Sequence, residues 1–463
     1  MTHPDPQHTG TRASTDGDPR ASTATDTRAT THGRSGTPEP FAATPATRVG
    51  HLPGGGLAAL LSAGLPADLV NLAMGTPEFP ATPAPLVDAA HAALRAGAHQ
   101  YTDPSGLPAL RARIAAGLPG SPDPADEITV TVGGSEGLCV ALLTVVDPGD
   151  EVIVLEPFYE NFLSAIAMAQ GVPVRVPLRG RHWLPDPDEL AAAFGPRTRA
   201  LILNSPANPT GTVLDRDLLH LVAELCEKWN VTVVSDEVYA PFVYDDGSTG
   251  TQAGTHTGTG VSALARHCSV AEIPGLADRS MVIGSLSKSH AVSGWRIGFL
   301  RARPHWTRLL RQVHVATTAG APTPLQHAAA SMELFGDDVR GTAVAMRERR
   351  DLAVALLRES GFTCEPPRGG CYVMAGIREL TTLDSPDFVR ELMNRTGVLM
   401  APATAFYADP RDGAGHVRVA FNRTTDTLEA ARKRLSVLAA STPPGSDSAQ
   451  DLSTWGGHAA AAH

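Results

Sequence analysis

Lysine, paired cysteines and long apolar runs are the features that this chain of 463 residues almost lacks. Its five cysteines, at positions 139, 226, 268, 364 and 371, are odd in number and include no C-x-x-C pair. This pattern argues against a disulfide framework and a structural zinc site, and it predicts a reduced, cytoplasmic protein without a metal. The longest apolar stretch, LCVALLTVV, is far shorter than the ~18 residues of a membrane span, so we expect a soluble protein.

Positive charge is also limited. The chain has 38 Lys and Arg against 48 Asp and Glu, which gives a formal net charge of −10, and no basic run of five or more occurs. This balance argues against a general nucleic-acid binder. The first residues, MTHPDPQHTG, lack the apolar region of a signal peptide. We therefore expect neither a nucleic acid nor a membrane as a partner.

Apolar residues are scarce at both ends of the chain. Residues 1–48 contain one Phe and no Leu, Ile or Trp, so they cannot bury enough apolar surface to offset the entropy lost on ordering. We predict disordered tails over 1–48 and 439–463. The segment DDGSTGTQAGTHTGTG at 245–260 predicts a mobile surface loop that extends to about 245–268.

Between the tails, short apolar runs alternate with helical patterns. Helical periodicity covers 135–146, 158–170 and 217–229. Buried strands are predicted at 127–132, 151–155, 199–204, 231–236 and 280–285. Strands that alternate with helices predict an α/β fold with a mostly parallel sheet covered by helices on both faces. In such sheets, ligands bind beyond the carboxyl ends of the strands.

Only three lysines occur in the chain, which otherwise uses arginine for positive charge. Lys228 and Lys433 lie in polar helical patterns that are typical of a solvated face. Lys288 instead follows the strand-like RSMVIGS and precedes the turn SGWRIG. A guanidinium stays charged in proteins, whereas a buried lysine amine can lose its proton and attack carbon. Lys288 is therefore a candidate nucleophile.

Two of the predicted strands are followed by groups that suit a phosphate. After 127–132 comes GGSEG, where glycines allow close backbone approach and Ser135 is predicted to cap the helix that follows. Gly-Gly-Ser is also an ordinary helix start, so this motif is weak by itself. The motif SLSKSHAVSGWRIG contributes hydroxyl groups and a guanidinium, the usual bidentate partner of a phosphate. The candidate phosphate ligands are Gly134, Ser135, Ser285, Ser287 and Arg296.

Three further strand ends carry polar or aromatic side chains. Tyr159 in EPFYEN could stack on a flat ring, and Asn208 lies in the turn-rich NSPANPTG. Asp236 in DEVY is costly to bury without a partner and could hold a protonated ring nitrogen, while Tyr239 would direct its hydroxyl into the same crevice. Each of these residues taken alone is common in ordinary strand ends and turns.

Taken together, these groups predict one ligand. They provide partners for a phosphate, a flat ring, a phenolic oxygen (Asn208 and Tyr239), a ring nitrogen (Asp236) and an aldehyde carbon (Lys288). A lysine Schiff base with an aspartate beside the ring nitrogen is what a protein contributes to pyridoxal 5′-phosphate. The sequence therefore predicts a pyridoxal 5′-phosphate site.

On these motifs the chain resembles the class I/II aminotransferases of pyridoxal-phosphate fold type I, nearest to the branch of kynurenine-, aromatic- and aspartate-type prokaryotic enzymes. The resemblance covers about 50–438. The segments that carry it are NLAMGTPEFP, QYTDPSGLPALR, TVGGSEGL, EPFYENF, NSPANPTG, SDEVYAPFVYD, SLSKSHAVSGWRIGF and VRVAFNR. The resemblance implies a large cofactor-binding domain at 81–325 and a smaller α+β domain built from 49–80 and 326–438.

The resemblance also implies roles for individual residues. Lys288 would form the aldimine with the cofactor, with Asp236 at the ring nitrogen and Asn208 and Tyr239 at the ring oxygen. The phosphate would be held by the ligands named above, and Tyr159 would stack on the ring. Tyr101 matches a tyrosine that reaches the phosphate of a partner subunit, which implies a homodimer with shared sites. Gly75 and Arg418 match the groups that hold the substrate α-carboxylate, for which a bidentate arginine is well suited.

The resemblance implies transfer of the α-amino group of an L-amino acid to a 2-oxo acid. The alternative is a lyase, cyclase or oxidase on the same scaffold, because the motifs around the ring do not separate these reactions. A transcription regulator with a degenerate domain of this kind would need a DNA-binding module ahead of residue 50, where the sequence has none. Two departures concern the substrate: Ala403 stands where the family usually has Gly, and the loop at 245–268 is long.

Overall fold

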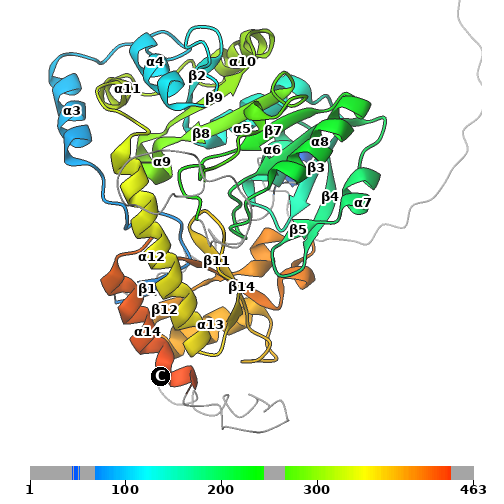
Figure 1. The fold of residues 1–463 in the computed structure, drawn as a ribbon, viewed down its shortest axis with the longest axis vertical. Helices are drawn as coiled ribbons and strands as arrows, with labels where there is room; N and C mark the ends of the chain where they lie inside the picture. Colours follow the sequence, from blue (N-terminus) through cyan, green and yellow to red (C-terminus); the bar gives the residue numbers. More distant parts are fainter. Residues whose placement is uncertain (1–43, 45, 51, 53–67, 245–265, 440–463) are drawn as a thin grey trace, which may run out of the picture. The chain divides into compact units, whose positions relative to one another are not determined.

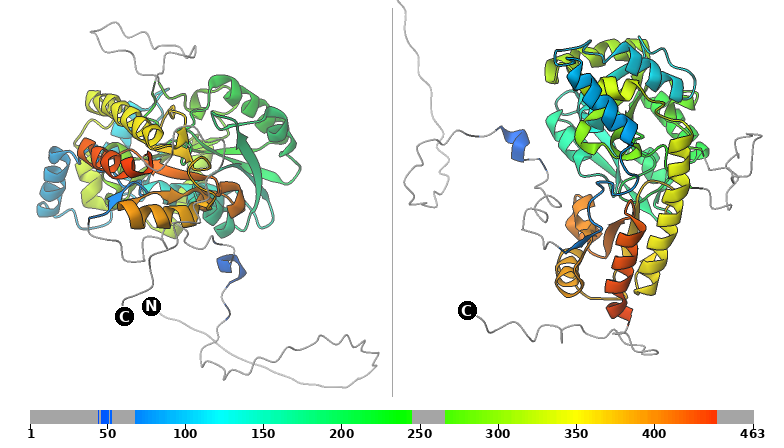
Figure 2. Two further views of the ribbon diagram at one scale, coloured as in Figure 1. Left: turned by 90° about the horizontal axis from the view of Figure 1, so that it is seen from below. Right: turned by 90° about the vertical axis from the view of Figure 1, so that its left-hand side faces the viewer.

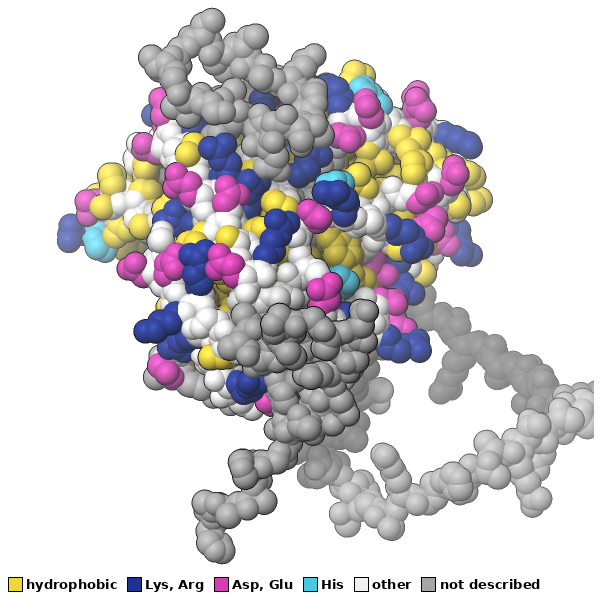
Figure 3. Space-filling view, turned by 60° about the horizontal axis from the view of Figure 1, so that its bottom comes forward, with side chains coloured by type: hydrophobic (Ala, Val, Ile, Leu, Met, Phe, Trp, Pro, Cys, Tyr) yellow, Lys and Arg dark blue, Asp and Glu magenta, His cyan; other side chains and the backbone are white. Residues whose placement is uncertain are grey.

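A computed structural model describes residues 44, 46–50, 52, 68–244 and 266–439 of the chain. The predicted tails and the predicted 245–268 loop fall almost entirely outside these residues, except that a short helix, α1 (Thr47–Gly50), overlaps the predicted end of the first tail. Within the described residues, no helix is long and apolar enough to cross a membrane. On the face drawn in Figure 3, the described acidic and basic side chains are interspersed.

The larger part of the fold is built on one eight-stranded sheet with the order β2-β9-β8-β7-β6-β3-β4-β5 (Figure 1). β5 and β9 pair antiparallel with their neighbours, and the other six strands run in one direction. The mostly parallel sheet is thus confirmed. The strands are β2 (Ile128–Val132), β3 (Glu151–Glu156), β4 (Val172–Arg179), β5 (Leu184–Pro185), β6 (Thr198–Asn204), β7 (Thr232–Asp236), β8 (Ser280–Ser285) and β9 (Ile297–Ala302).

The five predicted strands correspond to β2, β3, β6, β7 and β8. Sequence reasoning missed two long strands at other places in the sheet. β4 pairs only with β3 and the two-residue β5, and its residues are largely exposed or half-buried, so it lacks the continuous apolar run of a central strand. β9 begins inside SGWRIG, at Ile297, so turn residues mask the start of this strand in the sequence.

Helices cover both faces of this sheet, as the alternation of strands and helices predicts (Figures 1 and 2). α5 (Gly133–Val145), α6 (Asn161–Met168) and α10 (Pro304–Thr317) pack on one face, where Val154, Ile202 and Ile283 are buried. α7 (Pro187–Ala192) and α8 (Arg216–Trp229) pack on the other, against Ile153 and Leu201. Neighbouring residues of one strand thus enter different cores, as the pleat requires.

A third apolar cluster lies at the β2–β9 edge of the sheet. α3 (Ala84–Arg95), α4 (Pro108–Gly117) and α11 (Thr323–Ala330) pack there through apolar side chains such as Leu86, Leu110 and Ala328. Their buried partners on the sheet include Val130 and Phe299. This cluster fixes the position of β2, whose carboxyl end leads into the predicted phosphate turn.

The smaller part of the fold contains a four-stranded antiparallel sheet with the order β10-β11-β14-β13. Its core includes side chains from three helices and from the parallel pair β1–β12, in which Val70 lies opposite Val398. The smaller α+β region made from N-terminal and C-terminal segments is thus confirmed, while its exact boundaries stay a prediction. Its elements are β1 (Val70–Asn71), β10 (Thr363–Cys364), β11 (Tyr372–Gly376), β12 (Val398–Leu399), β13 (Ala401–Pro402), β14 (His416–Ala420), α12 (Asp337–Glu359), α13 (Ser385–Thr396) and α14 (Thr425–Ala439).

A buried ion pair ties the start of α5 to α10 and to the loop before α4. His314 lies with Nδ1 2.8 Å from Glu136 Oε1 and Nε2 2.8 Å from Pro104 O. Both partners only accept, so the ring donates from both nitrogens and is charged. Burial by itself would lower the pKa of His314, but the hydrogen bond and charge of Glu136 outweigh it and raise that pKa. Burial would likewise raise the pKa of Glu136, but the hydrogen bonds from His314, Thr318 and the backbone outweigh it and lower that pKa.

This pair predicts a defined pH dependence of stability. The His314 contribution is complete below the ordinary histidine pKa and is lost as the pH rises through the raised value. The Glu136 contribution is complete above the ordinary carboxyl pKa and is lost as the pH falls through the lowered value. We expect His314→Gln to destabilise the protein by about 3 kcal/mol at pH 5.5, because it leaves a buried charge unpaired, and by less at pH 9.

Thermal unfolding of the unmodified protein and of His314→Gln at pH 5.5 and pH 9 measures the loss of stability at each pH. His305→Gln is the matched control, because His305 is exposed on the same helix. An equal loss of stability at pH 5.5 and pH 9 for His314→Gln would contradict the charged pair.

Candidate active site

The carboxyl ends of five strands meet at one edge of the large sheet, and the predicted site residues follow them. β2, β3, β6, β7 and β8 all run in the same direction, so their carboxyl ends lie together. The residues at or just after these ends are Gly134, Ser135, Tyr159, Asn208, Asp236, Tyr239, Ser285, Ser287 and Lys288. The edge therefore collects side chains that lie more than 150 positions apart along the chain.

Lys288 lies in a single helical turn, α9 (Leu286–Ser289), which starts directly after β8. The turn begins where the hydroxyl of Ser285 accepts the backbone N–H of Ser287 at 3.1 Å. Lys288 Nζ donates to the carbonyl oxygen of Gly75 at 2.9 Å. Burial lowers the pKa of Lys288, and the charges of nearby arginines lower it further. Those arginines are Arg418, Arg423 and Arg296. This environment favours the neutral, nucleophilic amine.

Asp236 is the last residue of β7 and is half-buried. Burial raises the pKa of its carboxyl group to about 7, although the Val238 N–H hydrogen bond and the charge of Lys288 act in the opposite direction. The Val238 hydrogen bond is long, 3.3 Å between N and Oδ1. A carboxylate in this position is stabilised by a cationic N–H group, and a protonated ring nitrogen is such a group.

Hydrogen-bond donors that would suit a phosphate gather where α5 begins. Gly133 has a φ of 71°, and a Cβ atom there would lie 2.3 Å from Nη2 of Arg296. Only glycine therefore allows the guanidinium to approach the free N–H groups of the helix start. Nη1 of Arg296 donates to the carbonyl oxygen of Ser293 at 2.8 Å, which fixes the side chain. The hydroxyls of Ser285 and Ser287 lie 2.8 Å apart. This combination of donors fits a dianionic phosphate.

The prediction that Ser135 caps this helix is wrong. The helix begins at Gly133, so Val132 occupies the cap position and Ser135 lies inside the first turn, exposed to solvent. The side chain of Glu136 instead accepts the backbone N–H of Val132. The carboxylate takes over because its charge is already fixed there by His314. The contact of Ser135 with a phosphate stays a prediction.

Arg418 on β14 is buried, and its guanidinium lies over two aromatic rings. Its guanidinium carbon lies 4.2 Å from the ring centre of Tyr372 and 4.5 Å from that of Phe406. Nη1 donates to Asn208 Oδ1 at 2.9 Å, and Nη2 donates to the carbonyl oxygen of Ala73 at 2.6 Å. Among the described residues, the buried Nε atom has no hydrogen-bond partner. The guanidinium is thus fixed in position with donor capacity left over, which suits a ligand carboxylate.

Gly75 is confined between Lys288 and Tyr372. Its carbonyl oxygen accepts from Lys288 Nζ and from Asn422 Nδ2, the latter at 3.0 Å. A Cβ atom on Gly75 would lie 1.7 Å from the Tyr372 hydroxyl oxygen. Any other residue here would push the tyrosine away, so the glycine is required by close approach. The structure thus gives Gly75 a role that sequence reasoning missed, as the acceptor for the lysine amine.

The three predicted tyrosines have different environments. Tyr239 is buried, its hydroxyl donates to that of Tyr372 at 3.4 Å, and burial raises its pKa well above the ordinary value. The Tyr159 hydroxyl accepts from Asn161 Nδ2 at 2.7 Å, and burial, followed by the charge of Asp236, raises its pKa to about 12. Both phenols are therefore neutral donors at physiological pH. Tyr101 is 90% exposed, and its action at a partner's site stays a prediction.

Several residues of the site were missed from the sequence. Phe406 ends a short 3₁₀ turn, Ala403–Phe406, in which Ala403 is buried. The carbonyl oxygen of Phe406 accepts the N–H of Phe158 at 3.0 Å, which ties the turn to the carboxyl end of β3. Cys371 precedes Tyr372 and is buried close to Lys288, whose charge acts on its thiol. These residues lie in the segments GGCYV and PATAF, and neither segment carries a pattern that specifies contact with Arg418.

Comparison with known proteins agrees with this site. The family described as aminotransferase class I and II matches residues 67–435. The arginine–pyruvate transaminase AruH of Pseudomonas aeruginosa is 34% identical over 81% of this chain and 90% of its own length. Two solved structures superpose on most of the chain. N-succinyldiaminopimelate aminotransferase from Mycobacterium tuberculosis gives a TM-score of 0.76 at 34% identity, over 86% of this chain and 100% of that one.

The second structure is that of Escherichia coli YbdL, identified as a methionine aminotransferase. It gives a TM-score of 0.77 at 30% identity, over 86% of this chain and 100% of that one. All of these relatives are named as transaminases or aminotransferases. This favours transamination over the elimination, cyclisation or oxidation chemistries that the motifs left open. The chain belongs to the class I and II aminotransferases, enzymes that use pyridoxal 5′-phosphate to exchange amino groups between amino acids and 2-oxo acids.

Proposed function

We propose that Lys288 is the residue through which this aminotransferase works. The observation that carries the proposal is the position of its amine: half-buried, 2.9 Å from the Gly75 carbonyl oxygen, and next to a cluster of arginines that lowers its pKa. Such surroundings shift the amine toward its neutral form. It can attach to a carbonyl carbon, and after release it can take a proton and return it nearby.

The residues around Lys288 fit pyridoxal 5′-phosphate. Asp236 would hold the ring nitrogen, because a buried carboxylate with a raised pKa gains most from a cationic N–H. Asn208 and Tyr239 would donate to the ring oxygen, and Tyr159 would cover the ring. The cradle of Gly134, Ser135, Ser285, Ser287 and Arg296 would hold the phosphate. When bound, the cofactor supplies an electron sink that acidifies the Cα–H of an attached amino acid.

The chain's own residues then orient the substrate and move one proton. Arg418 would bind the α-carboxylate with its remaining donors, and the flanking rings of Tyr372 and Phe406 keep the guanidinium plane fixed. A carboxylate held there would present the Cα–H to Lys288. The Lys288 amine would take this proton and then return it to a different carbon atom, on the far side of the amino nitrogen. The burial of these groups excludes water, which strengthens each charge interaction.

We also propose that the enzyme is a cytoplasmic homodimer with shared active sites. Tyr101 supports the dimer, because an aromatic residue that is 90% exposed at the start of a loop is suited to contact a partner. The five free cysteines support a reducing compartment. The proposed division assigns residues 81–325 to the cofactor-binding domain and residues 49–80 with 326–438 to the smaller one.

Lys288→Ala tests the central assignment. We expect turnover to fall by about 10³-fold or more, because both the covalent attachment and the proton transfer depend on this amine. The visible absorbance of the purified, cofactor-loaded protein should change at the same time. Several amino donors are screened, each without an oxo-acid acceptor, so that the enzyme completes a single turnover. The measurement is the amount of 2-oxo acid released per active site.

The matched control is Lys228→Ala, which removes an exposed lysine from α8. It should leave turnover and absorbance unchanged. A Lys288→Ala variant that kept both would refute the assignment.

Asp236→Asn removes the carboxylate and keeps its shape. We expect cofactor affinity to fall about tenfold and turnover about 100-fold, because a charge-assisted hydrogen bond to the ring nitrogen is replaced by a neutral one. Titration of the apoenzyme with pyridoxal 5′-phosphate measures the first effect, and initial rates measure the second. Asp217→Asn on the exposed side of α8 serves as control. Unchanged affinity and rate in Asp236→Asn would remove this residue from the site.

Arg418→Lys separates substrate binding from cofactor binding. A lysine cannot make the planar bidentate contact or stack between two rings, so kcat/KM for the amino donor should fall by about 100-fold. The cofactor absorbance should not change. Arg411→Lys, at an exposed position in the same part of the chain, is the control. If Arg418→Lys lowered cofactor affinity and left KM unchanged, the proposed contact with the α-carboxylate would be wrong.

A further inference from the structure

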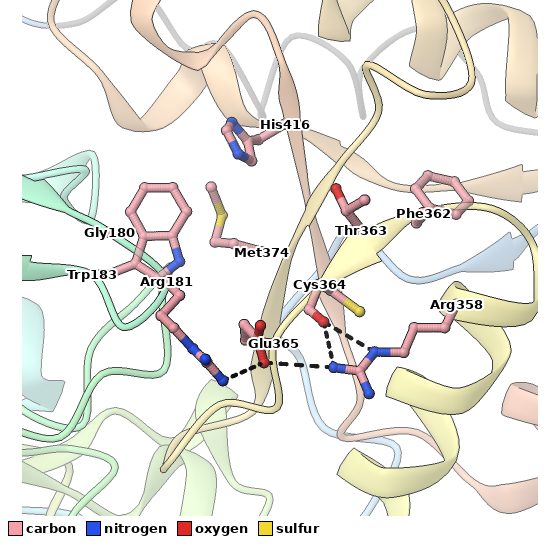
Figure 4. Close-up of a pocket in the computed structure, with 10 residues that line it drawn as sticks. All are labelled: Gly180, Arg181, Trp183, Arg358, Phe362, Thr363, Cys364, Glu365, Met374 and His416. Atoms are coloured by element: carbon pink, nitrogen blue, oxygen red, sulfur yellow. Dashed lines mark hydrogen bonds and ion pairs between the residues drawn. The ribbon is translucent and has the colours of Figure 1, made fainter. Parts of the chain in front are cut away.

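A cavity lies between the β4–β5 connection of the large sheet and the small sheet, and Lys288 is not among its lining residues (Figure 4). It is an open groove of about 660 Å³. Arg181 and Trp183 come from the β4–β5 connection, and the remaining wall comes from α12, β10, β11 and β14. The lining residues are Gly180, Arg181, Trp183, Arg358, Phe362, Thr363, Cys364, Glu365, Met374 and His416.

One side of the groove is apolar and aromatic. The indole of Trp183 meets the imidazole of His416 edge to face, with ring centres 5.4 Å apart and planes at 74°. Met374 lies beside these two rings (Figure 4). Trp183 has a φ of 53°, a conformation that bulky residues rarely adopt. The chain thus holds a large aromatic ring at the groove in a strained backbone, and such strain clusters at functional sites.

The other side of the groove is polar and carries an excess of positive charge. Arg181 and Arg358 both approach the single carboxylate of Glu365, at 3.5 and 3.6 Å. These distances are long for ion pairs, and both guanidinium groups are largely exposed. Arg358 also donates to the carbonyl oxygen of Cys364 at 3.1 and 2.7 Å. Two cations that share one anion leave a place for a second carboxylate.

His416 contributes an unused polar atom. Its Nδ1 is shielded from solvent and has no hydrogen-bond partner among the described residues. Burial, and then the charge of Arg378, lower the pKa of this histidine, so the ring is neutral at physiological pH. A neutral imidazole can donate or accept one further hydrogen bond there, which a ligand in the groove could supply.

The groove shares its strands with the proposed active site. His416 and Arg418 lie two residues apart on β14 and therefore project from the same face of the small sheet. Met374 on β11 lies directly opposite Arg418 in the strand register. An occupant that contacted Trp183 from the large sheet together with Met374 and His416 from the small sheet would bridge the two sheets beside the arginine that we assign to the substrate carboxylate.

We propose that this groove binds a small aromatic carboxylate as a regulatory ligand, separate from the amino donor. The ring would lie against Trp183 and Met374, and the carboxylate would meet Arg181 and Arg358. Because such a ligand fixes the position of β14 relative to the β4–β5 connection, its binding changes the apparent affinity of the enzyme for the amino donor. The coupling rests on the assignment of Arg418, whereas the binding does not.

Indole-3-acetate is the probe, because it has neither an α-amino nor an α-oxo group and cannot be turned over. Calorimetric titration of the cofactor-loaded, full-length enzyme measures its binding. We expect the double variant Arg181→Gln/Arg358→Gln to bind it at least about tenfold more weakly, because two charge-assisted contacts are lost. The matched control is Arg197→Gln. Arg197 is exposed and ion-paired with Glu151, the first residue of β3. This variant should bind as the unmodified enzyme does.

Initial rates with and without the probe complete the test. The probe should change KM for the amino donor by about twofold or more in the unmodified enzyme and in Arg197→Gln, and not in the double variant. Absence of binding at millimolar probe overturns the proposal. So does equal affinity in all three proteins, or competitive inhibition of equal strength in all three, since these results place indole-3-acetate at Arg418. Binding lost in the double variant without any effect on KM would refute the regulatory role.

Discussion

The proposed site depends on shielding the Lys288 amine from water, which favours loss of its proton. Lys288 Nζ has the Gly75 carbonyl oxygen as its hydrogen-bond acceptor, and the positive charges of three arginines surround it. Acceptance by a carbonyl fixes the position of the amine without adding a negative charge that would retain its proton. A carboxylate at the same place would hold a lysine ammonium ion and remove the nucleophile. The geometry of residues 71–76 therefore matters as much as the lysine itself.

That segment is held in place by residues at the end of β14, the strand that carries the proposed substrate arginine, Arg418. Arg423 donates to the carbonyl oxygens of Asn71 and Thr76 at 2.7 and 2.8 Å and also to that of Met74. Arg418 donates to the carbonyl of Ala73, and Asn422 to that of Gly75. These buried guanidinium groups satisfy backbone acceptors that would otherwise be costly to bury. The residues after β14 thus fix the acceptor for Lys288, and Arg418, which we propose binds the substrate carboxylate, is part of the same network.

The groove lined by Trp183 and His416 lies next to this hydrogen-bond network along β14. His416 lies on β14 only two residues from Arg418, and Met374 lies opposite Arg418 on the neighbouring strand β11. A small displacement of the strand pair would therefore reach the guanidinium plane and, through Ala73 and Gly75, the lysine amine. A packed strand transmits such a displacement because its side chains have little free volume in which to absorb it.

The sequence by itself determined the strands β2, β3, β6, β7 and β8, the mostly parallel sheet, and the candidate lysine. Apolar periodicity and turn residues are local signals, and the rarity of lysine in an arginine-rich chain made Lys288 conspicuous. It did not determine how Arg418 is supported, that Glu136 rather than Ser135 satisfies the start of α5, or that Trp183 and His416 line a groove. The bonds from Arg418 to Asn208 and from Lys288 to Gly75 join residues 210 and 213 positions apart. Contacts over such separations are decided by how the two sheets pack, because the chain carries no local pattern that specifies them.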